Sequence, residues 1–461
     1  MKDAVDILNL EYSTGGIRDI GIVEPSLSYL ELKYKLKIVR ACISDNFCEY
    51  IKIYQPKLIV ISNGIGTINH FEMVKYASMK GIKVITFISE GDMVDIKENV
   101  EILFWGNNKD KVFYEYANLQ WSEKNIQLIF KHIPEAKEYN LFCAGGTGFD
   151  RYQFLPLKSK SAFYDQYPQF KNYKKIIGLA GFPFYFFLSD LYKKDGQWTN
   201  MHLDHAAAEK MGEQKEPLRL MYKEIIRSNP ETLFILKYHP SDIMKEYSEF
   251  FELNQFENTL SIYKEENIDD VINISDLWIG FESTTCLEAW LLGKTTFIAN
   301  PDKVPFVRSI ISSGSPNYGT VEELNTAIKE FFETGVSLDF INFKEERENA
   351  IKQVIGFGDG LNHKRAGDFI YSALNEKCKA HKEDTEFIAA IEKKYASMDF
   401  RKKLRSMLYK TPLLFIPKIK KEYLKDQQKA NEFTNEKREA FASLYRNSLT
   451  EFYKKNNISL H

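Results

Sequence analysis

The sequence lacks any run of 18 consecutive apolar residues, so no segment is expected to span a bilayer. Its N-terminus, MKDAVDILNLEYS, carries acidic residues where a signal peptide needs a basic start and an apolar run. The five cysteines are odd in number and widely spread, with no CxxC pair, which argues against a disulfide framework and against a structural zinc site. We therefore expect a cytoplasmic protein.

A charge excess of either sign is also lacking. The chain has 62 Lys and Arg against 64 Asp and Glu, a net charge of -2, which gives no reason to expect nucleic-acid binding. What is present is length and apolar bulk: 461 residues, 44% of them hydrophobic, with 34 Phe and 26 Tyr. This length exceeds what one hydrophobic core normally serves and indicates two or three domains.

Short apolar runs alternate with longer amphipathic stretches, which is the pattern of parallel strands joined by crossover helices. In the first third, the expected strands are KLKIVRACI, KLIVISNG (57–64), KVITFISEGD (83–92), VEILFWGN (100–107) and a short one within NLFCAGGTGFDRYQF (140–154). The stretch 67–81 is expected to be a helix that ends at Gly81. Together these elements predict a first doubly wound domain.

A second alternating series follows a Lys-, Ser-, Tyr- and Pro-rich stretch at 155–173. Its expected elements are strands at 174–183, 231–240, LSIYKEE, 270–283 and 295–301, and helices near 215–228 and 284–294. The segment from about 320 is helical in pattern, and glycine disappears between about 383 and 458. We predict an N-terminal domain at 1–160, a second domain at 161–380 and a helical extension at 381–461.

The extension contains a basic stretch. Within residues 401–425, nine Lys and Arg meet one Glu and flank the apolar LLFIP. An amphipathic segment with lysines around apolar anchors can lie on an anionic membrane surface. The alternative is a solvated helix face packed on the protein.

The strongest chemical signal lies at two strand ends of the second series. His239 and Pro240 follow the apolar run LFILKY, and Ser283, Thr284 and Thr285 stand between another strand and a helix. Hydroxyls and backbone N–H groups at a helix start can bind an anion, and a histidine beside them adds a donor. This predicts a nucleotide-phosphate site, while a loop-ending His-Pro and a simple helix cap remain the plainer interpretations.

These motifs resemble those of a known enzyme group. KYHP followed by FESTTCLEAWLLGKTTFIANP is similar to the His-Pro and Ser-Ser/Thr motifs of bacterial capsule and surface-carbohydrate glycosyltransferases of the GT-B fold, particularly those using CMP-sialic acid or CMP-Kdo. The resemblance implies two Rossmann-like doubly wound domains that face each other across a cleft. It also implies an acidic base after a strand of the first domain, and Glu90 in SEGD matches that position although Ser89 replaces the first acid of the pattern.

Further roles follow from the resemblance and from the spacing. The resemblance implies that Glu288 of the EA pair binds the nucleotide ribose, the alternative being a helix-surface glutamate. Gly181 at the end of its strand allows close approach of a ligand to the backbone, or merely makes a turn. We expect no metal and no cofactor, because Asp269-Asp270 precedes a strand and the cluster of His202, Asp204 and His205 lies in an expected loop.

The expected function is transfer of a nonulosonic acid, sialic-acid-like or Kdo, from its CMP-activated donor to a glycan or glycolipid acceptor in bacterial surface polysaccharide (capsule or lipopolysaccharide) biosynthesis. Glu90 would be the base, and His239, Pro240, Ser283 and Thr284 would hold the donor. The alternatives are a UDP-sugar transferase or sugar 2-epimerase of the same fold, or a noncatalytic scaffold of capsule assembly. Peripheral contact with the inner face of the plasma membrane would occur through 401–425.

Overall fold

The structure is a computed structural model that describes residues 4–12, 18–184, 187, 205–240, 242, 245–301, 309–377, 381–409, 411, 416–417, 419–421, 423–424 and 434–460. The chain divides into two compact units. The first comprises Met1–Met93, Val100–Leu155 and Ile355–His461, and the second comprises Val94–Asn99 and Pro156–Val354. Because the chain returns to the first unit at Ile355, the C-terminal helices pack on the N-terminal sheet. The boundaries expected at 160 and 380 stay a prediction.

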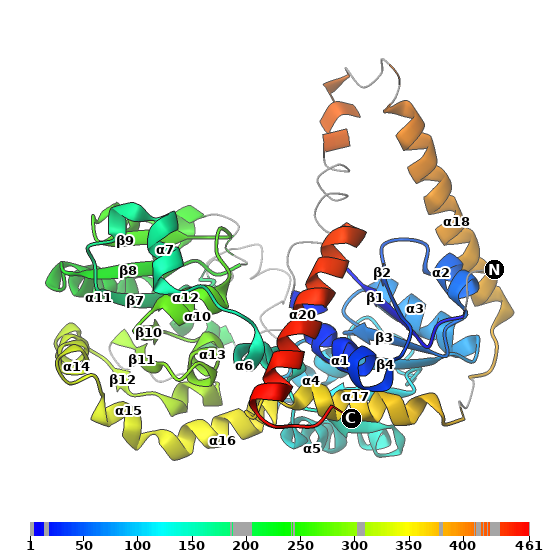
Figure 1. Cartoon of the computed structure of the whole chain (residues 1–461), viewed down its shortest axis with the longest axis horizontal. Helices are drawn as coiled ribbons and strands as arrows, with labels where there is room; N and C mark the ends of the chain where they lie inside the picture. The colour runs from blue at the N-terminus through cyan, green and yellow to red at the C-terminus, as the bar shows by residue number, and fades with distance from the viewer. Residues whose placement is uncertain are drawn as a thin grey trace. The chain divides into compact units, whose positions relative to one another are not determined.

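The first unit is built on a six-stranded, wholly parallel sheet of strand order β2-β1-β3-β4-β5-β6 (Figure 1). Its strands are β1 (Ile7–Glu11), β2 (Ile38–Cys42), β3 (Leu58–Ser62), β4 (Lys83–Phe87), β5 (Ala117–Gln120) and β6 (Leu141–Cys143). Its main helices are α1 (Arg18–Tyr34), α2 (Phe47–Tyr54), α3 (Ile68–Met79), α5 (Glu123–His132), α6 (Arg151–Phe154), α17 (Asn362–Leu374), α18 (Thr385–Leu408) and α20 (Asn435–Lys455). All five residues of β1, of β3 and of β4 are buried, as expected for strands covered on both faces.

Alternate residues of each strand pack into two different cores. Leu8 and Ile59 belong to a core with side chains of α2, α3 and α18, whereas Ile7 and Val60 belong to a core with α1 and α17. The sheet is therefore the middle layer of three.

The second unit contains another six-stranded parallel sheet, of order β12-β11-β10-β7-β8-β9. Its strands are β7 (Lys175–Ala180), β8 (Thr232–Lys237), β9 (Thr259–Ile262), β10 (Leu277–Gly280), β11 (Thr295–Ala299) and β12 (Asn317–Tyr318). Its helices include α7 (Lys160–Gln166), α10 (His205–Glu213), α11 (Lys215–Ser228), α12 (Ile268–Ile274), α13 (Thr285–Leu291), α14 (Val321–Thr334), α15 (Leu338–Asn342) and α16 (Lys344–Ile355). The predicted fold class, two doubly wound parallel sheets with a C-terminal helical extension, is confirmed.

Two strand assignments were wrong. The run VEILFWGN lies in helix α4 (Lys97–Trp105), where Val100 and Phe104, one turn apart, are buried and Ile102 is 40% exposed. Residues 270–276 were expected to begin a strand, but DVINI lies in α12 and the strand is only β10. Short apolar runs do not distinguish a strand from a partly buried helix, because the two differ in which residues face the core and not in composition.

The C-terminal helices are held to the first unit by buried polar contacts. The carboxylate of Asp150, in the segment AGGTGFDRYQF, accepts hydrogen bonds from Nδ2 of Asn362 (2.8 Å) and from N of His363 (2.6 Å). The His363 ring lies with Nδ1 2.8 Å from Asp150 Oδ2 and Nε2 3.0 Å from the Tyr453 hydroxyl. Asp150 therefore joins the start of α6 to α17 and, through the imidazole, to α20.

Candidate functional site

The predicted donor residues share one edge of the second sheet. Strand β7 pairs in parallel with β10 on one side and with β8 on the other. Gly181 follows β7, His239 and Pro240 follow β8, and Ser283 and Thr284 follow β10. Because the carboxyl ends of adjacent parallel strands meet at one edge, these residues gather where ligands of doubly wound sheets bind.

Gly181 and His239 are direct neighbours. The Gly181 N–H donates to the Lys237 carbonyl at 2.8 Å, and a Cβ at position 181 would lie 2.8 Å from the His239 nitrogen. Only glycine allows the two strand ends to come this close. The space beside the Gly181 Cα is thus occupied by the backbone of β8, and a contact of Gly181 with the donor stays a prediction. His239 is half-buried and Pro240 is exposed.

Aromatic packing fixes the loop after β7 against the end of β10. The ring centroid of Phe281 lies 5.3 Å from that of Phe182 and 5.4 Å from that of Phe184. All three side chains are buried in the core of the second unit. Phe281, two residues before Ser283, is therefore held by the same cluster that positions the loop containing Gly181.

The hydroxyl groups at the start of α13 differ in what they bind. Trp278 Nε1 donates to Thr285 Oγ1 (2.9 Å), which lies 2.8 Å from Ser283 Oγ, and Ser283 Oγ also accepts from Thr285 N (3.2 Å). Thr284, the N-cap residue, makes no side-chain capping bond and is exposed. Thr284 therefore presents the hydroxyl that a ligand can reach, while the Ser283 hydroxyl serves the turn. Sequence reasoning placed both in the site and did not separate these roles.

Glu288 lies one turn after Thr284 on α13, and its N–H donates to the Thr284 carbonyl at 3.3 Å. Residues four apart lie on one face of a helix, so the half-buried carboxylate shares a face with the Thr284 hydroxyl. Its expected role at the ribose stays a prediction.

Buried charge beside the His-Pro loop was missed. Asp242 is 1% exposed, and its N–H donates to the His239 carbonyl at 3.0 Å. Burial raises the pKa of Asp242 to about 6, partly opposed by the His239 N–H and the ammonium of Lys215. Burial also raises the pKa of Glu249, which accepts from the Phe182 N–H (3.0 Å), to about 8.

These acids could not be found from sequence, because HPSD and SEFF carry no pattern that indicates burial. Their presence means that both loops bordering the predicted phosphate site, after β7 and after β8, rest on buried carboxyl groups.

In the first unit, Glu90 lies at the carboxyl end of β4, as predicted, and is exposed. The loop that carries it is fastened on three sides: Asn63 Nδ2 donates to Ser89 Oγ (2.8 Å), Trp121 Nε1 to the Ile88 carbonyl (2.8 Å), and Asn125 Nδ2 to the Gly91 carbonyl (2.7 Å). Ser89, which replaces an acid of the family pattern, thus binds the loop after β3. The role of Glu90 as base stays a prediction.

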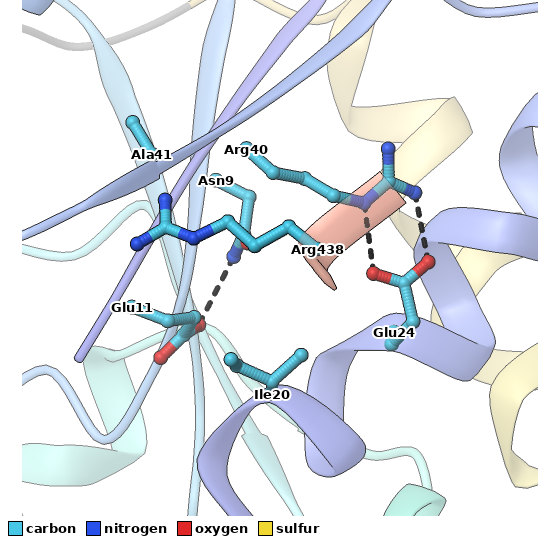
Figure 2. A pocket seen from close by; sticks show the side chains of 7 residues that line it. All are labelled: Asn9, Glu11, Ile20, Glu24, Arg40, Ala41 and Arg438. Atoms are coloured by element: carbon cyan, nitrogen blue, oxygen red, sulfur yellow. Dashed lines mark hydrogen bonds and ion pairs between the residues drawn. The ribbon is translucent and has the colours of Figure 1, made fainter. Parts of the chain in front are cut away.

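A second carboxyl group at this edge was missed. Glu11 ends β1, is 3% exposed, and accepts a hydrogen bond from Asn9 Nδ2 at 3.0 Å (Figure 2). It also accepts from Ser62 N (2.7 Å), and its other oxygen accepts from Ser62 Oγ (2.5 Å). Burial raises the pKa of Glu11 well above the usual range of a carboxyl group. The signal available in the sequence was an acid closing the apolar run ILNL.

A small cavity lies beside Glu11. It is lined by Asn9, Glu11, Ile20, Glu24, Arg40, Ala41 and, from α20, Arg438 (Figure 2). Its volume of about 10 Å³ holds roughly one water molecule and no sugar. The cavity is therefore too small for a glycan to contact Glu11 there.

The cluster of His202, Asp204 and His205, for which no metal was expected, lies outside the described residues except for the backbone of His205. Within the described ranges, no group of three or more His, Cys, Asp or Glu side chains is arranged to hold a metal ion. The described helices include none that is both long and apolar enough to cross a membrane.

Comparison with known proteins identifies the fold. No protein-family model matches the chain, and no curated protein matches it in sequence. Among solved structures, it is similar to a Listeria monocytogenes protein assigned as a UDP-N-acetylglucosamine 2-epimerase (TM-score 0.52, 13% identity, 82% of this chain and 99% of that one). It is also similar to the Neisseria meningitidis UDP-GlcNAc 2-epimerase bound to UDP-GlcNAc (TM-score 0.51, 12% identity, 80% of this chain and 100% of that one). The structure of S. aureus MnaA with UDP is similar as well (TM-score 0.50, 13% identity, 81% of this chain and 97% of that one). At these identities the likeness shows the GT-B fold.

Proposed function

We propose that this chain is a metal-independent GT-B glycosyltransferase that moves a nonulosonic acid, sialic-acid-like or Kdo, from its CMP-activated form to a glycan or glycolipid acceptor. The reaction would serve bacterial surface polysaccharide synthesis. The observation that carries the proposal is the gathering of His239, Gly181 and Thr284 on three adjacent strand ends of one sheet. That edge is the ligand-binding edge of a doubly wound sheet.

In the proposed reaction, the acceptor hydroxyl forms a bond to the anomeric carbon as the bond from that carbon to the phosphate oxygen breaks. The proton of the hydroxyl passes to Glu90, and CMP leaves with the bonding electron pair. His239 and the Thr284 hydroxyl donate to the phosphate, where negative charge develops. Since α13 has only seven residues, these side chains and not a long helix dipole would supply most of the stabilisation.

Nucleotide specificity tests the donor class. A ligand that binds only the folded protein stabilises it, so we expect CMP to raise the melting temperature more than UDP or GDP at equal concentration. The same shift should disappear in His239→Ala. Stabilisation by UDP alone, with no effect of CMP, would contradict the CMP-sugar assignment and leave a UDP-sugar enzyme.

The identity of the base is tested by two isosteric changes. Glu90 is exposed and Glu11 is enclosed, so Glu90→Gln should lower kcat on a CMP-sugar by about 100-fold or more and remove the acidic limb of the pH profile. Glu11→Gln should keep that limb. If Glu11→Gln abolishes the limb and Glu90→Gln does not, the base is assigned to the wrong residue.

A UDP-sugar 2-epimerase is the second candidate, favoured by the structures above, whose chains are covered over 97–100% of their length. Incubation with UDP-GlcNAc separates the two, because an epimerase yields the C2 epimer without an acceptor. A noncatalytic scaffold would bind nucleotide and turn over neither donor.

A further inference from the structure

Helix α18 has two halves with different surroundings. In the first half, Ile388, Ile391 and Tyr395 are buried against the first unit, and the Tyr395 hydroxyl donates to Asn69 Oδ1 at 3.2 Å. The packing ends near Asp399, which accepts from Asn46 Nδ2 at 2.7 Å. From residue 400 to residue 407 every side chain is exposed, and the last contact with the body of the unit is that of the Lys402 ammonium with Asp45 Oδ1 (3.0 Å) and the Ser44 carbonyl (3.2 Å). The end of the helix beyond Lys402 extends away from the sheet (Figure 1).

These exposed turns carry a stripe of large apolar side chains. Phe400, Leu404 and Met407 are 68%, 48% and 65% exposed. At about 100° per residue, they fall within a sector of about 60°, whose centre is roughly 150° from the face that holds Ile388 and Tyr395. The stripe is therefore no continuation of the buried face, and the core of the first unit cannot cover it.

Cations border the stripe. On the same helical projection Lys403 lies about 40° to one side of it and Arg401 about 60° to the other, and both are exposed. An apolar stripe edged by basic side chains is the pattern of a helix that lies in a bilayer interface.

The returning arm of the chain repeats this composition. The rings of Tyr409 and Tyr423 lie 5.1 Å apart and join the two arms. On the second arm Ile416 and Leu424 are 45% and 55% exposed, and Lys420 is exposed as well. With nine Lys and Arg against one Glu, residues 401–425 carry an excess of positive charge in a chain whose net charge is -2. Exposed apolar and cationic side chains thus occur on both described arms.

We propose that the exposed end of α18, residues 400–407, docks together with Ile416, Lys420 and Leu424 on the surface of an anionic phospholipid bilayer. Phe400, Leu404 and Met407 would insert among the acyl chains, and Arg401, Lys403 and Lys420 would lie at the lipid phosphates. A nucleic acid would satisfy the cations and leave the apolar stripe in water. A neutral protein partner would cover the stripe and leave the cations unpaired. A bilayer with acidic headgroups satisfies both, and the docking does not depend on which reaction the two sheets support.

The experiment measures binding of the full chain to vesicles by flotation. We expect binding to vesicles of phosphatidylglycerol and phosphatidylcholine, little binding to phosphatidylcholine alone, and weaker binding in 0.5 M salt. Phe400→Ser with Met407→Ser should weaken the partition by about tenfold or more, since two large apolar side chains no longer enter the lipid. Arg401→Glu, Lys403→Glu and Lys420→Glu together should weaken it by about 100-fold or more, at about fivefold for each lost cation.

Two matched controls change exposed residues that lie outside the proposed docking segment. Leu338→Ser with Ile341→Ser removes apolar side chains that are 66% and 48% exposed, and a triple change of Lys109, Lys329 and Lys344 to Glu alters charge alone. Both controls should bind vesicles like the unchanged chain. Equal binding to neutral vesicles, or equal loss in the controls, would overturn the proposal. It would also be overturned if the serine variant altered self-association in gel filtration and left vesicle binding unchanged.

Discussion

At the scale of single residues, the start of α13 separates two hydroxyls that look equivalent in the sequence. Ser283 and Thr285 bind each other and Trp278, so their hydroxyls stabilise the turn. Thr284 makes no capping bond and is exposed. The structural interpretation of the Ser-Thr-Thr motif therefore holds for Ser283 and Thr285, and the expected contact of Thr284 with a phosphate stays a prediction.

This division predicts the behaviour of Thr284→Ala. Because the Thr284 hydroxyl caps nothing, its removal should change the free energy of unfolding by less than about 0.5 kcal/mol. If it binds the phosphate, affinity for CMP should fall about tenfold, as for the loss of one hydrogen bond to a charged group. Isothermal titration and denaturant unfolding measure the two quantities.

The matched control is Thr320→Ala in the same unit. Thr320 caps α14 through a capping box with Glu323, so its loss should cost about 1 kcal/mol of stability and leave CMP affinity unchanged. Should Thr284→Ala behave like Thr320→Ala, Thr284 is a cap and not a ligand.

Asp242 gives a pH-dependent prediction. Its pKa in the folded protein, about 6, lies above that of an unfolded aspartate, so the folded state binds more protons between about pH 4 and pH 6. The contribution of Asp242 to the free energy of unfolding is therefore fully present below about pH 4, and it is lost as pH rises through 6. Asp242→Asn keeps the shape without the charge, and at pH 7.5 it should raise the free energy of unfolding of the second unit by about 1 to 3 kcal/mol.

The readout is the denaturant midpoint at pH 4, 6 and 7.5. At pH 4 the variant and the unchanged chain should agree to within about 0.5 kcal/mol, since the carboxyl group is then protonated in the folded state and about half protonated in the unfolded state. Destabilisation by Asp242→Asn at pH 7.5 would show that the ionised carboxylate is stabilised in the folded protein, contrary to its enclosure.

At the scale of elements, the loop after β4 holds its exposed acid by close packing. A Cβ at Gly91 would lie 2.1 Å from the Trp121 ring, whose Nε1 fastens the same loop. Gly91→Ala should therefore displace the loop, cost about 1 to 3 kcal/mol in the first unit, and lower turnover by moving Glu90.

Gly21→Ala is its control. At Gly21, inside α1, an added Cβ would meet its nearest atom at 3.6 Å, an ordinary contact. This change should stabilise the helix by about 0.5 to 1 kcal/mol with turnover unchanged. Equal effects of the two alanines would mean that the loop after β4 adapts freely.

The elements predicted best were those with local signals. Helix α3 begins at its cap Thr67 and is followed by Gly81 with φ of 72°, and α14 ends at Gly335 with φ of 74°. Strand β5 was missed because ANLQ is polar; Asn118 and Gln120 bond to each other in the sheet, and Asn118 also bonds to Thr86. Such pairing is set by neighbouring strands and leaves no mark in the segment itself.

The site divides in the same way. His239 and Ser283 could be placed because each directly follows an apolar strand, and parallel pairing brings such ends together. The surroundings of Glu11 and Asp242 include residues far away in the chain, such as Ser62, which donates to Glu11, and Lys215, whose charge acts on Asp242. Local pattern therefore identifies edge residues and misses buried carboxyl groups.

At the scale of the whole molecule, the C-terminal extension is part of the first unit. Arg40 on β2 forms bidentate contacts with Glu24 and Glu31 of α1, and Arg446 of α20 adds a contact to Glu31 at 2.9 Å. Beside this network Tyr29 stacks on Tyr453, with centroids 5.9 Å apart. The solved structures with this fold match only about four-fifths of the chain.

Two leucines on α20 test whether this packing stabilises one unit alone. Leu449 is fully buried against Tyr29 and Tyr453, whereas Leu444 is 39% exposed on the same helix. Leu449→Ala should cost about 2 to 4 kcal/mol, and Leu444→Ala less than about 0.5 kcal/mol. Helix propensity cannot account for a difference, since both changes are leucine to alanine within one helix.

Hydrogen exchange locates the effect. Because α20 packs on α1, Leu449→Ala should speed exchange in Ile7–Glu11 and Ile38–Cys42 and leave Lys175–Ala180 and Thr232–Lys237 unchanged. Faster exchange in all four strands would mean that the two units unfold as one. In that case the C-terminal helices stabilise the second sheet as well, and changes in the extension would alter the proposed nucleotide binding through stability alone.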